Sequence, residues 1–216
     1  LIEAKIDNLD AALSSYEQSD QLFAGLIHKQ PQDWELHSGR SKTLTAIGNV
    51  HYTRGELAEA AQCYREAIDI RTQVASEQSN DAESLRLLAN AHMNLGLVEQ
   101  AGGNLEVAAE EYERAEAIRR DLLHEHPDDA AVQRDLARGL FNQAMLNSLE
   151  ADRLETGPVS QERFARVEEQ LQESRELFEQ LAEDAPLDPD RQYPLAMCYR
   201  MLADWYARHD AASAAE

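Results

Sequence analysis

The stretch "AIGNVHYTRGELAEAAQCYREA" (residues 46–67) decides the fold, because the chain repeats it at a fixed offset. Forty-eight residues later, residues 94–115 read "NLGLVEQAGGNLEVAAEEYERA", and eight of the 22 positions are identical. Gly103 corresponds to Gly55, and glycine inside a helix costs about 1 kcal/mol relative to alanine. We therefore expect each of these glycines to form a turn between two helices. The identical positions in the first stretch are Gly48, Val50, Gly55, Leu57, Ala60, Ala61, Tyr64 and Ala67.

Apolar residues at i, i+3, i+4 and i+7 lie on both sides of the glycine turn, which predicts a stack of antiparallel helix hairpins. Small residues recur where helices would approach closely, and large residues recur where the space between hairpins must be filled. We expect close approaches at Gly48, Gly96, Ala144 and Ala203, and on the second helices at Ala60, Ala67, Ala108 and Ala115. The expected large residues are Tyr16, Tyr64 and Tyr112.

The repeat predicts a single solenoid over residues 1–216. Residues 1–29 form the second helix of an incomplete unit, and full units follow at 33–78, 80–125 and 128–184. A further first helix or a capping helix occupies 188–210. The step from Tyr112 to Leu171 is 59 residues rather than 48, and Gly157-Pro158 places the extra residues in a loop at about 150–161. Helix starts are predicted at Asn80, Asp128 and Asp188. Because the pattern is already under way at Leu1, we interpret the chain as a segment of a longer protein.

The composition narrows the function. Acidic residues outnumber basic ones by 41 to 20, giving a formal net charge of −21. A surface of this sign repels phosphate backbones, so nucleic acid is not an expected partner. No run of 18 apolar residues occurs, so membrane insertion of this segment is not expected. Cys63 and Cys198 are far apart in sequence and have no zinc-ligand spacing, which argues against a disulfide framework and a metal site.

These motifs resemble those of tetratricopeptide-repeat (TPR) proteins, whose first helix carries a leucine-glycine pair and whose second carries alanine, an aromatic residue and alanine. The matching residues of the second unit are His92, Leu95, Gly96, Gly103, Ala108, Tyr112, Ala115 and Pro127. The family's usual period is about 34 residues, so the helices here are longer. Units of this length are similar to kinesin-light-chain-type arrays and to the TPR regions attached to bacterial serine/threonine protein kinases. The resemblance implies an all-α, right-handed superhelical solenoid of antiparallel hairpins.

The resemblance also implies a concave groove, lined by the first helices, that holds a protein or peptide ligand. The corresponding groove positions are Lys42, Thr45, Asn49 and Tyr52 in the first full unit, Asn90, Met93, Asn94, Leu97 and Gln100 in the second, and Arg138, Phe141, Asn142 and Met145 in the third.

Some co-chaperone TPR domains clamp a terminal carboxylate, and Asn49, Asn94 and Arg138 match three of the positions that do so. Thr45 and Asn142 replace the other two, which are basic in those domains. The amide-rich groove is therefore better suited to an extended peptide held by its backbone.

No catalytic motif is recognised, so we expect neither enzymatic activity nor a cofactor in this segment. His124 and His126 are two residues apart and cannot share a helix face, so a metal site is not expected there. Gly102-Gly103 lacks the following lysine of a phosphate-binding loop.

The last helix carries two apolar stripes: Leu195, Tyr199, Leu202 and Tyr206 on one, and Met197, Met201 and Trp205 on the other. One stripe can pack on the preceding hairpin, and the other is covered by a helix outside this segment or forms an interface. Two functions follow as hypotheses. One is a non-catalytic peptide-binding scaffold within a larger bacterial signalling protein, such as a serine/threonine kinase. The other is a structural module that forms a homodimer through residues 195–206. We expect a cytoplasmic location, with any membrane anchor of the parent outside this segment.

Overall fold

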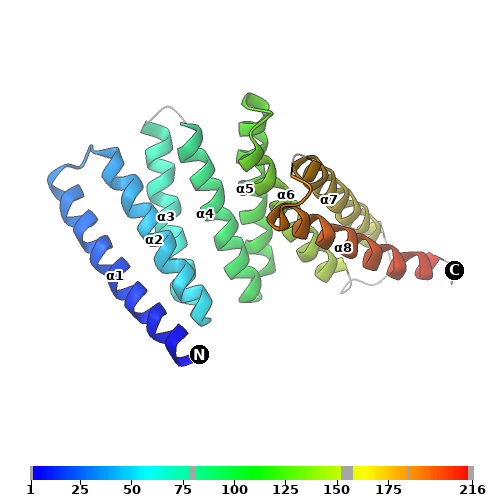
Figure 1. Cartoon of the computed structure of the whole chain (residues 1–216), viewed down its shortest axis with the longest axis horizontal. Helices are drawn as coiled ribbons and strands as arrows, with labels where there is room; N and C mark the ends of the chain where they lie inside the picture. Colours follow the sequence, from blue (N-terminus) through cyan, green and yellow to red (C-terminus); the bar gives the residue numbers. More distant parts are fainter. Residues whose placement is uncertain (1, 78–80, 152–157, 184, 214–216) are drawn as a thin grey trace. The chain divides into compact units, whose positions relative to one another are not determined.

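The structure, a computed structural model, describes residues 2–77, 81–151, 158–183 and 185–213. These residues form helices joined by short turns (Figure 1), and no strand occurs among them. The predicted all-α hairpin class is therefore confirmed. Backbone contacts divide the chain into two compact units, Leu1–Ile118 and Arg119–Glu216, and each is described by itself.

The first unit consists of α1 (Ile2–Lys29), α2 (Trp34–Arg54), α3 (Leu57–Glu77), α4 (Ala82–Ala101) and the larger part of α5 (Leu105–Glu125). In Figure 1, α1 to α4 lie side by side in chain order, and each packs against the next. Helix α2 also touches α4. The first helices of the two hairpins, α2–α3 and α4–α5, are thus in direct contact.

The predicted glycine turns are confirmed. Gly55 and Gly103 have φ values of 78° and 83°, in the left-handed region that glycine adopts without steric cost. The N–H of Glu56 donates to the carbonyl of His51 across the first turn, at 2.9 Å. Gly102 has a φ of −77°, so only Gly103 of the glycine pair carries the turn.

The repeated small and large residues pack as predicted in both hairpins of the first unit. Tyr64 and Tyr112 are only 2% and 1% exposed. Tyr64 forms a core cluster with residues of α3 and of the next first helix, including Leu95 and Val98. The alanines that flank the tyrosines are fully buried; they are Ala60, Ala67, Ala108 and Ala115.

The second unit consists of the last residues of α5 with α6 (Ala130–Ala151), α7 (Pro158–Glu183) and α8 (Pro189–Ser213). Helix α7 packs on α6, and α8 packs on α7. One core cluster joins Ala144, Val167, Leu171, Leu202 and Trp205. A second joins Ala137, Phe178, Leu181 and Cys198. Phe141 packs against both clusters and so links them.

The helix bounds follow the predicted ranges closely, but two of the predicted starts shift by one residue. Helix α4 is capped by Asp81, whose carboxylate accepts from the N–H of Ser84 at 3.1 Å, and not by Asn80. Helix α6 is capped by Asp129 rather than Asp128. The cap at Asp188 is confirmed. Of the predicted insertion loop at about 150–161, residues 152–157 lie outside the described residues. Its two ends are helical instead, since α6 extends to Ala151 and α7 begins at Pro158.

Two of the predicted packing positions are wrong. Tyr16 is 39% exposed, although its repeat partners are buried. Helix α1 meets α2 through Phe23 instead, whose ring would lie 2.6 Å from a Cβ atom added to Gly39. Ala203 is also exposed. The repeat predicts the residue type at these positions, but burial also requires a helix on that side.

The predicted division of α8 into two stripes is also wrong. The described residues of α8 that are buried are Cys198, Leu202 and Trp205. Leu202 belongs to the first predicted stripe, Trp205 to the second, and Cys198 to neither. Tyr199 and Tyr206 are exposed, and their hydroxyls donate to Glu179 and Glu168 of α7. Trp205 is buried because it packs with Phe164 of α7, at a ring separation of 5.6 Å.

Candidate peptide-binding site

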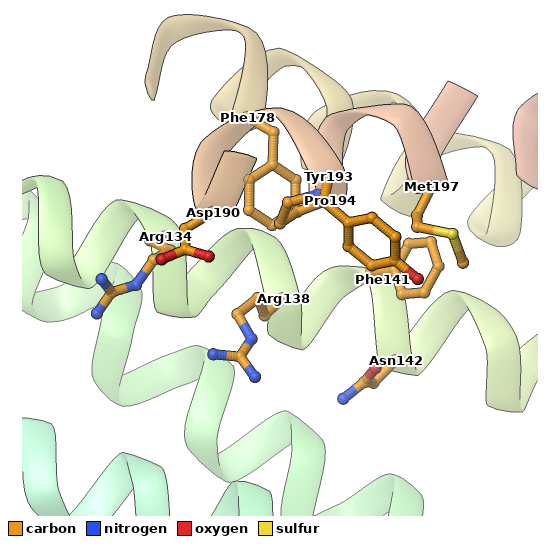
Figure 2. Close-up of a pocket in the computed structure, with 9 residues that line it drawn as sticks. All are labelled: Arg134, Arg138, Phe141, Asn142, Phe178, Asp190, Tyr193, Pro194 and Met197. Carbon is orange, nitrogen blue, oxygen red and sulfur yellow. The ribbon is translucent and has the colours of Figure 1, made fainter. Parts of the chain in front are cut away.

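A pocket of about 320 Å³ opens in the second unit, between α6 and the start of α8 (Figure 2). It contains Arg138, Phe141 and Asn142, three of the four groove residues that the sequence predicts for the third unit, but not Met145. A second hollow of about 300 Å³ shares three of its lining residues. The main pocket is lined by Arg134, Arg138, Phe141, Asn142, Phe178, Asp190, Tyr193, Pro194 and Met197.

Helix α6 presents one polar and aromatic face to the pocket. Arg134, Arg138, Phe141 and Asn142 are spaced by four, three and one residues, which places them on the same side of a helix. The two arginines are exposed, whereas Phe141 and Asn142 are half-buried. The pocket wall on this side therefore combines two cations, an amide and an aromatic ring.

Helix α8 supplies the opposite wall through Asp190, Tyr193, Pro194 and Met197, again at helical spacing. Tyr193 is 68% exposed, so much of its ring is open to a ligand. Pro194 lies inside the helix and has no N–H to donate to the carbonyl of Asp190. The α8 wall is therefore mostly apolar, with a backbone acceptor at its start.

Phe178 of α7 is buried beneath the pocket and accounts for its existence. The 48-residue and 59-residue steps give Arg71, Arg119 and Phe178 the same place in successive units. Arg71 fills the corresponding space with its guanidinium, which donates to the hydroxyls of Ser41 (3.2 Å) and Thr45 (3.0 Å). The Phe178 side chain is shorter than arginine and has no hydrogen-bond donors, so in the third unit the space between the two first helices stays open.

Arg71 also connects the two first helices of the first unit. Its guanidinium donates to the carbonyl of Leu87 in α4 as well as to Ser41 and Thr45 in α2. Burial lowers the pKa of Arg71 to about 10, so the side chain stays protonated at neutral pH. Leu87 corresponds to Pro194, which lines the pocket.

Three charged residues line the pocket: Arg134, Arg138 and Asp190. Arg134 lies 3.5 Å from the carboxylate of its neighbour Asp135. Within the described part of the chain, Arg138 has no carboxylate at ion-pair distance. An arginine without an acidic partner is unusual on a chain with a net charge of −21. Its guanidinium can bind a carboxylate with two parallel hydrogen bonds.

The predicted groove residues of the first unit differ in how available they are. On α2, Lys42, Asn49 and Tyr52 are exposed. The Asn49 side-chain oxygen accepts from the Tyr64 hydroxyl at 2.6 Å, and the Thr45 hydroxyl is engaged by Arg71. On α4, Asn90, Asn94 and Leu97 are half-buried, whereas Met93 is buried. No pocket comparable to that of the second unit brings these eight residues together among the described cavities.

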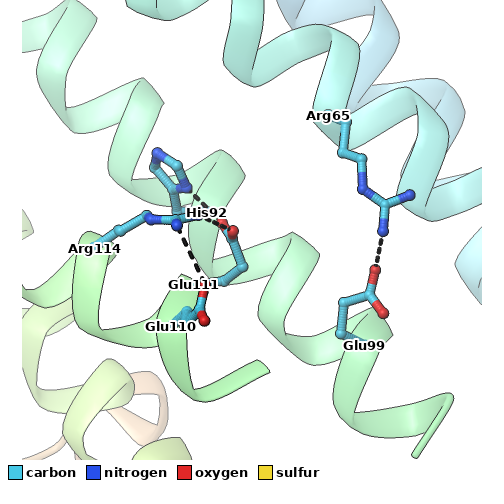
Figure 3. Close-up of polar contacts among 6 residues, drawn as sticks. All are labelled: Arg65, His92, Glu99, Glu110, Glu111 and Arg114. Carbon is cyan, nitrogen blue, oxygen red and sulfur yellow. Dashed lines mark hydrogen bonds and ion pairs between the residues drawn. The ribbon is translucent and has the colours of Figure 1, made fainter. Parts of the chain in front are cut away.

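Two buried carboxylates in the first unit belong to the framework (Figure 3). The His92 ring nitrogen Nδ1 lies 2.6 Å from Glu111, which also pairs with Arg114. Their equivalents in the preceding unit are Leu44 and Cys63, an apolar pair. This correspondence identifies the His92–Glu111 pair as a packing contact between α4 and α5.

Glu99 is the second buried carboxylate. It pairs with Arg65 of α3 (Figure 3). It also accepts from the Asn104 amide at 2.7 Å, across the glycine turn. The same two positions in the preceding unit hold His51 and Glu56, which lie 2.5 Å apart. The polar contact across the turn is therefore a repeated feature of the hairpin.

Among the described residues, no three metal-ligating side chains gather at one point. None of the described helices is both long and apolar enough to cross a membrane.

Comparison with known proteins identifies the repeat. A family profile described as "Tetratricopeptide repeat" matches residues 41–73, which span most of α2 and α3. This part of the chain is therefore similar to a tetratricopeptide repeat. No curated protein sequence matches the chain.

One solved structure supports the fold. BtubC (BKLC) from P. vanneervenii superposes with a TM-score of 0.63 at 20% identity, over 93% of this chain and 66% of that one. The chain thus spans slightly less than two thirds of BtubC. A tetratricopeptide repeat protein from Parabacteroides merdae ATCC 43184 matches with a TM-score of 0.33 at 20% identity, over 97% of this chain and 75% of that one. At 20% identity the likeness to BtubC concerns the fold alone.

The groove prediction missed six of the residues that line the pocket. Two of them, Tyr193 and Met197, could have been predicted from the repeat, because they lie 59 residues after Arg134 and Arg138. The change from Arg119 to Phe178 was a third signal, since it replaces a long cation by a ring. The other missed residues are Arg134, Asp190 and Pro194.

Proposed function

We propose that this chain is a non-catalytic scaffold that binds a protein partner through an extended peptide segment, and that the pocket between α6 and α8 is its main anchoring point. The observation that carries the proposal is the convergence of Arg138, Phe141 and Asn142 with Tyr193 and Met197 in one pocket. Repeats of this type generally bind protein partners, which supports the proposal.

The residues that line the pocket indicate which side chains the bound peptide should carry. The apolar wall of Phe141, Tyr193 and Met197 suits an aliphatic or aromatic side chain. Arg138 suits a carboxylate next to that side chain, and the Asn142 amide suits the peptide backbone. We therefore infer a ligand with an acidic residue beside a large apolar one.

A random-peptide display library selected on the immobilised chain tests the proposal. The selected sequences are expected to pair Asp or Glu with Leu, Ile or Phe, and a synthetic peptide from the selection is then titrated by fluorescence anisotropy. Arg138→Ala is expected to weaken binding about ten- to hundredfold, because a charge-assisted hydrogen bond contributes about 1.5–3 kcal/mol. Tyr193→Ala is expected to weaken it as well.

Arg200→Ala is the matched control. Arg200 is exposed on α8, and it does not line the pocket, so its removal changes the net charge equally without touching the site. Binding by the Arg200→Ala variant should equal wild-type binding within twofold. If the Arg138→Ala and Arg200→Ala variants lost equal affinity for the peptide, the effect would come from net charge and not from the pocket. If Arg138→Ala left the affinity unchanged, the pocket would be rejected as the binding site.

We also propose that the scaffold belongs to a larger bacterial signalling protein of the cytoplasm, such as a serine/threonine protein kinase. The support is the resemblance of its long units, with their Tyr64-Arg65 and Ile70-Arg71 pairs, to TPR regions attached to such kinases. The complete sequence of the parent gene tests this proposal. A neighbouring domain without kinase motifs would reject it.

A homodimer through residues 195–206 is the second candidate function. The exposed rings of Tyr199 and Tyr206 favour it, because large apolar surface on one helix face is typical of interfaces. Sedimentation analysis over a wide concentration range tests it, and a monomer at every concentration would reject it.

A further inference from the structure

The exposed face of α6 continues beyond the pocket between α6 and α8. The face begins with Arg134 and Arg138, which line the pocket and follow one another along α6 (Figure 2). About two turns further on, it holds Met145 and Leu149, which are 41% and 48% exposed. Steps of three or four residues connect these positions, so they share one side of the helix. The exposed stripe of α6 consists of Arg134, Arg138, Phe141, Asn142, Met145 and Leu149.

Methionines contribute to this surface from both helices. Met145 lies on α6, and Met197 and Met201 lie on α8. Met197 lines the pocket, and Met201 is half-buried against the same core cluster as Phe141. Thioether side chains are flexible and polarizable, so a surface that contains them adapts to aliphatic and aromatic partners of different shape. The apolar surface of the pocket therefore extends towards the C-terminal end of α6.

The charge of the exposed stripe is confined to one end. Its start carries two arginines, whereas its members from Phe141 to Leu149 are uncharged. The 59-residue step gives Met145 and Leu149 the equivalents Asp204 and Arg208 on α8, two residues of opposite charge. The arginine end therefore favours an acidic residue of a ligand, and the Leu149 end favours an apolar one.

We infer that the bound peptide carries a second apolar residue that packs on Met145 and Leu149, which rests on the proposed function because the pocket holds the first one. Eight residues of α6 separate Phe141 from Leu149, a length of about 12 Å. In an extended peptide, which rises about 3.3 Å per residue, alternate residues face the same side. Residues two apart then span about 7 Å and fall short, whereas residues four apart span about 13 Å and match.

The order of the stripe fixes the order of the ligand residues. Arg138 and Leu149 lie on opposite sides of Phe141 along α6. The acidic residue of the peptide therefore lies outside the apolar pair, next to the first apolar residue. Peptides enriched by the display selection should show two apolar positions four residues apart, with the acidic residue beyond one of them. Enrichment of a single apolar position, or of an acidic residue between two apolar ones, would overturn the inference.

Fluorescence anisotropy with two synthetic peptides measures the second contact directly. The first peptide has the enriched sequence, and the second has alanine in place of the apolar residue farther from the acidic one. Leu149→Ala is expected to weaken binding of the first peptide about three- to tenfold, because apolar surface is no longer buried there. The same variant should bind the second peptide like the wild type, within about twofold, because Leu149 then has no partner to lose. Met145→Ala should behave in the same way.

Leu22→Ala is the matched control, because Leu22 is 69% exposed on α1, in the first unit; this variant should bind both peptides like the wild type. Circular dichroism melts check that all variants remain folded. If Leu149→Ala and Met145→Ala bound the first peptide as tightly as the wild type while Arg138→Ala bound it more weakly, the inference would be overturned and the proposed function would stand. Unchanged binding in the Arg138→Ala variant would instead reject the proposed function.

Discussion

Tyr64 packs directly on Gly48, so closely that the repeat permits no side chain at the glycine unless the ring becomes smaller. The third unit shows the alternative solution, since Ala144 and Leu171 take the same two positions and both are fully buried. The contact between the helices of a hairpin is thus conserved in volume within the chain, while its residues change.

This exchange predicts a coupling between Gly96 and Tyr112. Gly96→Ala should destabilise the first unit by about 1–3 kcal/mol through overpacking, despite the better helix propensity of alanine. Tyr112→Leu alone should also destabilise it, by leaving a cavity. The double variant should cost less than the sum, which urea denaturation of the four proteins would measure. Additive costs would contradict the proposed equivalence with Ala144 and Leu171.

Arg71 is predicted to stabilise the contact between α2 and α4 through its hydrogen bonds. Arg71→Ala should lower the free energy of unfolding by about 2–4 kcal/mol, because it removes the bonds to Ser41, Thr45 and Leu87 and leaves a cavity. Arg71→Lys keeps the charge but not the planar set of donors, so it should recover only part of the loss. Thermal and urea unfolding give both values, and full recovery by lysine would mean that charge alone matters.

The His92–Glu111 pair is predicted to be replaceable by its apolar equivalent. His92→Leu alone should cost about 1–3 kcal/mol, since it leaves a buried carboxylate oxygen without its ring partner. Adding Glu111→Cys recreates the Leu44–Cys63 pair of the preceding unit and should restore part of the loss. A double variant that is less stable than the additive expectation would assign the pair a role beyond packing.

The two cysteines are predicted to react slowly in the folded chain. Burial, together with the nearby Glu66 carboxylate, raises the pKa of Cys63 to about 11, and burial raises the pKa of Cys198. At pH 8 the Cys63 thiolate is then about a hundredfold scarcer than for a thiol of ordinary pKa. Reaction with Ellman's reagent should be slow at pH 8, should accelerate as the pH rises towards 11, and should become fast in urea. A fast native reaction at pH 8 that is absent in the Cys63→Ser variant would contradict the raised pKa.

The sequence predicts most of the helical framework, because the 48-residue repeat links residue type to packing position. Gly55, Tyr64 and Ala67 each recur where the structure needs a turn, a large ring or a close approach. The repeat failed at Tyr16 and Ala203, because it cannot reveal whether a neighbouring helix lies against them. It also failed on α8, where Trp205 turns inward to pack with Phe164.

The pocket was only partly predictable. Arg138, Phe141 and Asn142 follow from the groove register of the first helices. The pocket itself arises from a departure from the repeat, the replacement of an arginine by Phe178, and its second wall depends on how α8 packs. Such a cavity depends on side-chain length and helix placement together, which periodicity alone does not contain.

The most direct test of the peptide-binding account uses the methyl groups of the four methionines, Met93, Met145, Met197 and Met201, as positional reporters in NMR. Met197 lines the pocket, whereas Met93 lies in α4 of the first unit. Carbon-13 labelled methionine gives one resonance for each, assigned by single Met→Leu variants, and the display-selected peptide is then titrated in. The account predicts that the Met197 resonance moves most and saturates with the affinity measured by anisotropy, and that the Arg138→Ala variant loses this shift. Saturating binding that moves Met93 and leaves Met197 unchanged would contradict it.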